Sequence, residues 1–194
     1  MRKVLVVATA AALLCMGAIG AFAQIPNMQV YFDKNLQQTQ ADCKGFLYED
    51  TLQVVCNNFN MLMSTVEFGI QPPTVNAYYN GDIIPAGALI LGDNTANQGL
   101  VITYPLPRNC FFPFVACQLR ITWLCDVCGQ AGPPASIFNE PIKVIPNQTS
   151  GLLRAIEYQS LRVIDVVGMT STICPESNAT EESTWGKVKS LYAQ

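Results

Sequence analysis

The sequence predicts an all-β fold, an antiparallel β-sandwich of about nine strands followed by a short C-terminal helix. The clearest strand pattern runs through residues 115–125, where apolar and polar side chains alternate. Its apolar positions are Val115, Cys117, Leu119, Ile121, Trp123 and Cys125, and its polar positions are Gln118, Arg120 and Thr122. Alternation with a period of two is typical of a strand with one buried face. Four of the eight cysteines also lie in residues 109–129, which indicates a sandwich stapled by disulfides around this strand.

Further apolar runs, bounded by Gly, Pro and Asn, supply the remaining strands. They cover residues 28–32, 52–56, 61–70, 88–91, 100–104, 142–145, 152–158 and 161–174. The turn-forming residues 57–60 predict a hairpin between the second and third of these runs. Pro72-Pro73 should end one strand, and Pro105 with Pro107 should close another, because proline cannot donate to a β-ladder. We expect Val115, Leu119, Ile121 and Trp123 in the core, with Gln118, Arg120 and Thr122 facing outward.

The N-terminus has the pattern of an export signal. Arg2 and Lys3 precede an apolar run over residues 4–14, and Ala21-Phe22-Ala23 places small residues before a cleavage site between Ala23 and Gln24. The alternatives are an uncleaved membrane anchor and a lipid anchor on Cys15. We therefore expect a signal peptide over residues 1–23, a sandwich domain over 24–174, no stable membrane span after cleavage, and a secreted, cell-surface or periplasmic location.

The charge pattern excludes two classes of partner. The chain has a net charge of −3, and no Lys or Arg occurs between Lys44 and Arg108. Nucleic acids and anionic membrane surfaces are bound by clustered basic side chains. We expect neither partner.

The cysteines are expected to form structural disulfides. Cys125 and Cys128 form a CxxC that should close a local bridge, with further bonds among the other candidates, Cys43, Cys56, Cys110, Cys117 and Cys174. Because Cys15 leaves with the signal, the odd number that remains predicts one free or intermolecular thiol. Two alternatives are a redox CxxC, which would need a following helix, and a zinc site that takes its second cysteine pair from Cys110 and Cys117.

The chain contains no histidine, which excludes Ser-His-Asp and Cys-His nucleophile systems. A secreted enzyme that uses paired carboxylates remains an alternative, although Asp and Glu are scattered singly. We expect a non-catalytic protein without a cofactor or metal.

Aromatic residues offer candidate binding positions. Tyr78 and Tyr79 lie in an expected loop and are the candidate binding aromatics for a sugar ring or an apolar patch on a partner. For Phe111, Phe112 and Phe114, core packing is the favoured interpretation.

The tail differs from the domain. Residues 175–194 are expected to form a polar linker and a short amphipathic helix. Trp185, Val188, Leu191 and Tyr192 give the helix an apolar stripe that needs a cover. It either folds back on the domain or serves as a docking or sorting element.

The strand order, the segment from Val66 to Ile70 followed by Pro72-Pro73, and the ending from Glu182 to Tyr192 resemble uncharacterised secreted proteins of environmental bacteria. The layout is also similar to cohesin-type and immunoglobulin-like β-sandwiches. This second resemblance implies a binding or adhesion module for an unknown protein or glycan at the cell surface. A self-associating subunit of a surface layer or filament is the alternative.

Overall fold

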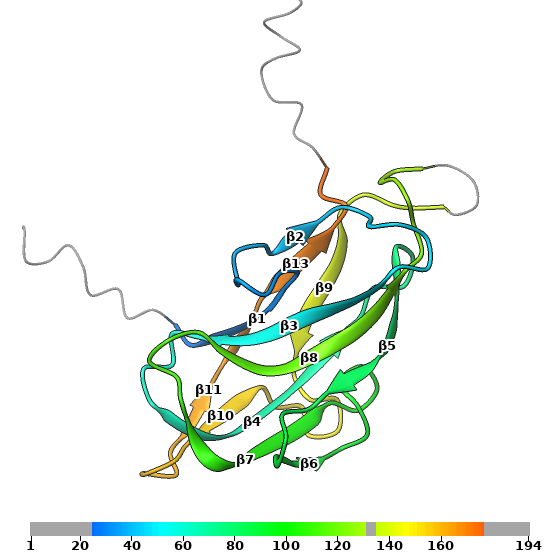
Figure 1. The fold of residues 1–194 in the computed structure, drawn as a ribbon. Coiled ribbons are helices and arrows are strands. Elements are labelled where there is room, and N and C mark those ends of the chain that lie inside the picture. The colour runs from blue at the N-terminus through cyan, green and yellow to red at the C-terminus, as the bar shows by residue number, and fades with distance from the viewer. Residues whose placement is uncertain (1–24, 131–134, 177–194) are drawn as a thin grey trace, which may run out of the picture.

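The computed structural model describes residues 25–130 and 135–176, which form two β-sheets packed face to face (Figure 1). The first sheet has the strand order β12, β1, β3, β8, β5. Its strands are β1 (Asn27–Tyr31), β3 (Glu49–Asn57), β5 (Ala77–Ile83), β8 (Phe114–Trp123) and β12 (Val167–Gly168). Of these pairings only that of β1 with β12 is parallel.

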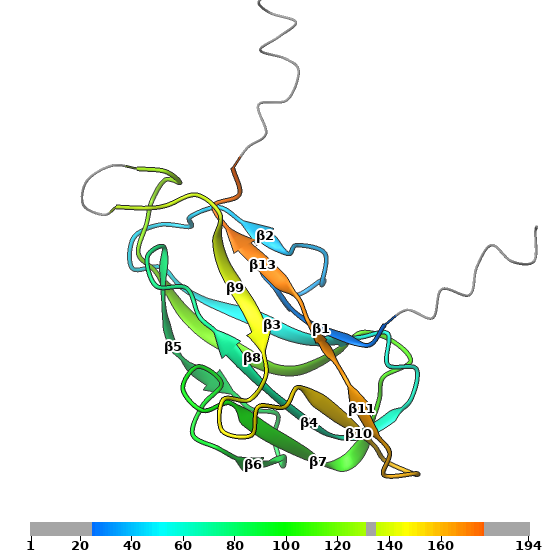
Figure 2. The same ribbon diagram turned by 180° about the vertical axis from the view of Figure 1, so that it is seen from behind.

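The second sheet has the order β11, β10, β4, β9, β13, β2, with β7 also paired to β4 and β6 paired to β7 (Figure 2). Its strands are β2 (Gln40–Ala41), β4 (Leu62–Gln71), β6 (Leu89–Leu91), β7 (Leu100–Asn109), β9 (Glu140–Ile145), β10 (Arg154–Glu157), β11 (Val163–Asp165) and β13 (Thr170–Ile173). The all-β prediction is confirmed. The expected C-terminal helix lies outside the described residues. Among residues 25–130 and 135–176, no helix is long and apolar enough to cross a membrane.

The core fills the space between the sheets. The largest fully buried side chains from the first sheet are Met28, Leu52, Leu119, Ile121 and Trp123, and those from the second are Met63, Phe68, Ile70, Leu100, Ile102, Ile142 and Ile173. Each inner face is apolar because alternate residues of a strand point to the same side.

The alternation predicted for β8 holds over its C-terminal half and fails at its start. Leu119, Ile121 and Trp123 are buried, and Arg120 is exposed. Val54 of β3 pairs with Cys117 whereas Val55 pairs with Val115, so Ala116 is an extra residue in β8. This β-bulge moves Val115 to the outer face, where it is half-buried, and Ala116 takes the inward position.

The predicted hairpin between residues 52–56 and 61–70 is wrong. β3 pairs with β1 and β8 in the first sheet, whereas β4 belongs to the second sheet. Asn58 and Asn60 have φ angles of 63° and 50°, a conformation that asparagine tolerates well. The connection therefore carries the chain from one sheet to the other.

Proline ends one of the two strands at which the sequence predicts a stop, but not the other. β4 ends at Gln71 before Pro72-Pro73, as expected. β7 instead continues through Pro105 and Pro107 to Asn109, because residues 104–107 bulge opposite Ser64 of β4 and lie beyond the residues 101–103 that pair with β6. The run 161–174 is divided among β11 in the second sheet, β12 in the first and β13 in the second, to which it returns after Met169.

Candidate functional site

The residues expected to form a loop around Tyr78 and Tyr79 form β5, the edge strand beside β8. Tyr79 pairs with Ile121 and Gly81 pairs with Arg120, so Asn80 is an extra residue in β5. Bulges of this kind redirect side chains. The sequence Asn80-Gly81 suits one, because Gly81 adopts a φ of +134° that other residues rarely take.

The bulge places a polar group beside the central strands. Asn80 Nδ2 donates a hydrogen bond of 2.6 Å to Thr122 Oγ1 on β8. A Cβ atom at position 81 would lie 3.5 Å from a terminal nitrogen of Arg120, so the guanidinium group lies over the glycine. Asn80, Arg120 and Thr122 are thus gathered on the outer face of the first sheet.

A shallow hollow of about 390 Å³ lies at this place. It is lined by Glu49, Asp50, Thr51, Asn80, Arg120, Ile121 and Thr122. Glu49 and Tyr78 both pair with Thr122, and Thr51 pairs with Arg120, so these side chains share the outer face. We call Glu49, Thr51, Tyr78, Asn80, Arg120 and Thr122 the β5–β8 face.

The two candidate tyrosines point to opposite sides of β5. The side chain of Tyr78 is 63% exposed and stands on the β5–β8 face. Tyr79 points inward, where its hydroxyl oxygen lies 3.4 Å from Thr95 Oγ1. Burial raises the pKa of Tyr79 above its ordinary value. Of the two candidate tyrosines, Tyr78 is the exposed one.

Buried contacts fix the rim of the hollow. The Asp50 carboxylate accepts hydrogen bonds from Lys44 Nζ at 2.6 Å and from Trp123 Nε1 at 3.3 Å. Trp123 is fully buried, so the indole N–H needs this partner. Asp50 therefore holds the end of the face in place.

Several other carboxylates also serve as structural acceptors. Glu140 accepts hydrogen bonds from the backbone N–H groups of residues 74–76, and Asp82 accepts two from Thr95. Glu67 binds Arg154 Nε at 2.6 Å and the Ser150 hydroxyl. These carboxyl groups, and Asp50, are committed to holding loops and strands.

The phenylalanines do not share one environment. Phe114 is half-buried and packs edge-on against Tyr104, with ring centroids 5.3 Å apart. Phe111 and Phe112 are 56% and 73% exposed, so core packing is the wrong prediction for both. They lie in the turn between β7 and β8, beyond the last paired residues.

A second exposed apolar surface lies on the opposite sheet. Leu89, Ile90 and Leu91 make up the whole of β6, and they are 73%, 45% and 72% exposed. Among residues 25–130 and 135–176, β6 pairs with β7 alone, which leaves its other edge without a partner strand from these residues. Open apolar edge strands are sites at which further strands can pair.

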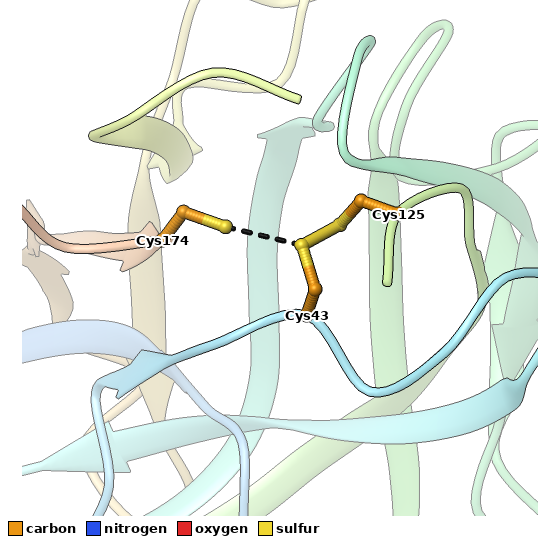
Figure 3. A group of neighbouring side chains, drawn as sticks. All are labelled: Cys43, Cys125 and Cys174. Carbon is orange, nitrogen blue, oxygen red and sulfur yellow. Dashed lines mark hydrogen bonds between the residues drawn. A yellow bond between two sulfur atoms is a disulfide. The ribbon is translucent and has the colours of Figure 1, made fainter. Parts of the chain in front are cut away.

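The disulfide pairing differs from the local bridge expected for Cys125 and Cys128. Cys43 is bonded to Cys125, and Cys128 is bonded to Cys174. Cys43 follows β2 and Cys174 follows β13, so strand pairing brings both to the turn after β8 (Figure 3). The two bonds tie three segments together at one end of the sandwich.

Three cysteines of the described residues are free instead of the single one expected. Cys56, Cys110 and Cys117 are buried in the core. Burial raises the pKa of the Cys56 and Cys117 thiols well above the ordinary value, and that of Cys110 to about 12. They behave as small apolar side chains.

The export signal, its cleavage site at Ala23 and Gln24, and the tail residues Trp185, Val188, Leu191 and Tyr192 lie outside the described residues.

No protein-family model and no curated protein matches this chain. Solved structures of cohesin modules do. A cohesin module of a family 33 glycoside hydrolase from Clostridium perfringens is 8% identical, with a TM-score of 0.48, and the match covers 78% of this chain and 98% of that one. The sixth cohesin of scaffoldin B from Acetivibrio cellulolyticus, solved with a Cel5 dockerin, is 11% identical, with a TM-score of 0.46 and coverage of 79% and 100%.

A third match is a cohesin of Clostridium acetobutylicum, 7% identical, with a TM-score of 0.45 and coverage of 80% of this chain and 94% of that one. These matches agree with the expected resemblance to cohesin-type sandwiches.

Proposed function

We propose that this chain is an exported, non-catalytic binding module that recognises a protein or glycan at the cell surface through the β5–β8 face. One observation carries the proposal: an exposed tyrosine stands beside a hollow that offers a guanidinium, an amide, hydroxyls and a carboxylate. A tyrosine ring covers apolar area at low entropic cost, and the polar groups around it supply directional hydrogen bonds. Such a set suits a sugar ring or a polar protein surface.

The scaffold behind this face supports the same role. Tyr78 and Asn80 lie on β5, and Arg120 and Thr122 lie on β8, which is held between β3 and β5. Side chains on paired strands keep their positions better than side chains on loops. The two disulfides fit an oxidising compartment, which supports export.

Binding assays with single-residue variants test the proposal. The full chain, processed by its own exporting cell, is used as bait against envelope proteins of the source organism and against a polysaccharide array. Tyr78→Ala and Arg120→Ala should each weaken the captured interaction about tenfold or more, because exposed Tyr and Arg are typical interface anchors. Tyr158→Ala is the matched control, since Tyr158 is 50% exposed and follows β10 on the other sheet. Equal loss in all three variants, or in none, would refute the assignment of the site.

Self-association is a second candidate, favoured by the exposed edge strand β6. Leu89 and Leu91 are each more than 70% exposed, and a copy of the chain could pair with the open edge. Size-exclusion chromatography at rising concentration separates the two candidates. A ladder of oligomers supports assembly, and a single monomer peak at high concentration supports the binding module.

We also propose roles for the terminal segments, on sequence alone. Residues 1–23 act as a cleaved export signal, and the stripe of Trp185, Val188, Leu191 and Tyr192 acts as a docking element. N-terminal sequencing of the exported chain should begin at Gln24. Deleting residues 184–194 should leave thermal stability unchanged and abolish surface retention. Lost stability with normal retention would instead mean that the tail folds back on the domain.

A further inference from the structure

The four disulfide-bonded cysteines form one compact sulfur cluster. Besides the bonds within each disulfide, Cys43 Sγ lies 3.2 Å from Cys174 Sγ and 3.9 Å from Cys128 Sγ. The sulfurs of Cys43, Cys125 and Cys174 all lie within 4.8 Å of one another. Figure 3 shows these three side chains pointing toward one another. Three sulfurs thus meet at one place, and the fourth, that of Cys128, lies beside those of Cys43 and Cys174.

This spacing matches the requirement of a tetrahedral metal ion. Zinc binds thiolate sulfur at about 2.3 Å, which places neighbouring sulfurs of a tetrahedral four-cysteine site about 3.8 Å apart. The separations of 3.2 and 3.9 Å between the two disulfides bracket that value. Opening the disulfides frees each cysteine side chain to rotate toward this spacing.

The backbone that carries the cysteines is held by hydrogen bonds that do not depend on sulfur. Cys174 N donates to Ala41 O at 2.7 Å, and Asn139 N donates to Cys174 O at 2.8 Å. On the other side, Leu47 N donates to Trp123 O at 2.7 Å, and Phe46 N donates to Asp126 Oδ1 at 2.6 Å. The four positions should therefore stay together in the reduced chain.

The local sequence also suits a metal. Cys125 and Cys128 have the two-residue spacing of a zinc-binding CxxC. Gly129 follows with a φ of +71°, and its missing side chain leaves room for the Phe138 ring. Cys43 and Cys128 are half-buried, which leaves an open side, and Asp42 Oδ1 lies there 3.5 Å from Cys128 Sγ. A carboxylate at this opening favours the entry of a cation.

We propose that the reduced chain binds one zinc ion through Cys43, Cys125, Cys128 and Cys174, and that forming the two disulfides expels it. In binding, four thiols release four protons and hold the ion as thiolates. In oxidation, the four zinc-bound thiolates give four electrons to two molecules of a small disulfide, which take up four protons from solution and become four thiols. The zinc thiolates become two disulfides, and Zn²⁺ is released. The four cysteines would thus stabilise the fold through zinc–thiolate bonds before export and through disulfides after it.

The test uses the full chain and zinc alone. A phosphine reduces the two disulfides, taking one oxygen from water for each bond, and the reduced chain is desalted without air. Elemental analysis should find one zinc per reduced chain and none in the oxidised chain. Cobalt, used as a probe in place of zinc, should show the intense visible bands of a tetrahedral thiolate site.

Variants locate the ion. Cys43→Ser and Cys174→Ser should each weaken zinc affinity about 100-fold, and Cys117→Ala should leave it unchanged because Cys117 lies in the core. Since a serine variant could fail to fold, alkylation of the reduced wild-type chain is followed in parallel. Zinc should protect the four cluster cysteines from the reagent. A folded reduced chain that retains no zinc, zinc bound equally by the oxidised chain, or protection confined to other cysteines would overturn the proposal.

Discussion

The outer faces of the two sheets expose different kinds of side chain. On the first sheet, the β5–β8 face leaves a tyrosine and a guanidinium exposed around a hollow. On the second, Glu67 is closed off by Arg154 and Ser150, and the exposed side chains beyond it are the leucines of β6. The first face combines an exposed aromatic ring with directional polar groups. The second combines the apolar edge of β6 with a smaller hollow of about 260 Å³, whose described lining holds Glu67, Gln98, Asn147, Thr149 and Ser150 but no aromatic side chain. The face with both polar groups and an aromatic ring is therefore the better candidate for specific recognition.

The largest change in the free energy of unfolding is expected at high pH, from the three free cysteines in the core between the two sheets. Burial raises the pKa of the Cys56, Cys110 and Cys117 thiols, whereas a thiol in the unfolded chain has a pKa of about 8.5. Their stabilising effect is complete below that pH and is lost as the pH rises toward the folded values, about 12 for Cys110. The free energy of unfolding should fall by up to about 1.4 kcal/mol per thiol for each pH unit above about 9.

Urea unfolding at pH 8, 9, 10 and 11 measures this slope. Cys117→Ala should remove about a third of the part that the thiols contribute. Identical slopes for the variant and the wild type would show that this thiol does not stay protonated in the fold.

The next largest effect concerns the closed face. Glu67→Gln leaves the Arg154 guanidinium without its carboxylate, and we expect a loss of about 2–3 kcal/mol, since Arg154 is only partly exposed. Glu157→Gln is the matched control, because Glu157 meets Arg162 at 3.7 Å in a more exposed pair and should cost about 0.5 kcal/mol or less. Chemical denaturation measures both. Equal losses would mean that the Glu67 network does not close the second face.

A smaller loss is expected on the open face. Gly81→Ala places a side chain at a φ of +134° and should cost about 1–3 kcal/mol of stability. Because the same bulge positions Asn80 and Arg120, binding should weaken as well. Thermal unfolding and the affinity for the captured partner are measured together. An unchanged affinity would mean that the bulge at Gly81 does not position the residues that bind the partner.

The smallest change in stability is expected at β6. Leu91→Lys should alter the free energy of unfolding by about 0.5 kcal/mol or less, since Leu91 is 72% exposed. If the chain self-associates through this edge, the same variant should be monomeric in sedimentation velocity. Oligomers that persist in the variant would rule out the edge as the contact.

The sequence predicted the sandwich because hydrophobic alternation depends on local spacing alone. Leu119, Ile121 and Trp123 could be placed in the core for this reason. Val115 could not, because the bulge at Ala116 arises from pairing with β3, which lies far away in the sequence. β5 was missed because Asn80-Gly81 inside it is a typical turn sequence, and here it forms a bulge.

The disulfide pairing could not be predicted from the sequence for a related reason. The CxxC spacing favours a local bridge, but the partners Cys43 and Cys174 arrive through the pairing of β2 with β13. The candidate site combines residues from β3, β5 and β8. Tyr78 could be named from its residue type, whereas Arg120 could be predicted only to face outward.

The most direct test of the binding face is hydrogen exchange of the chain with and without its captured partner. Bound partner should slow exchange in peptides that cover β5 and β8, around Tyr78 and Arg120, and should leave β6 unchanged. Protection confined to β6 and β7, with β5 and β8 unaffected, would contradict the assignment of the β5–β8 face.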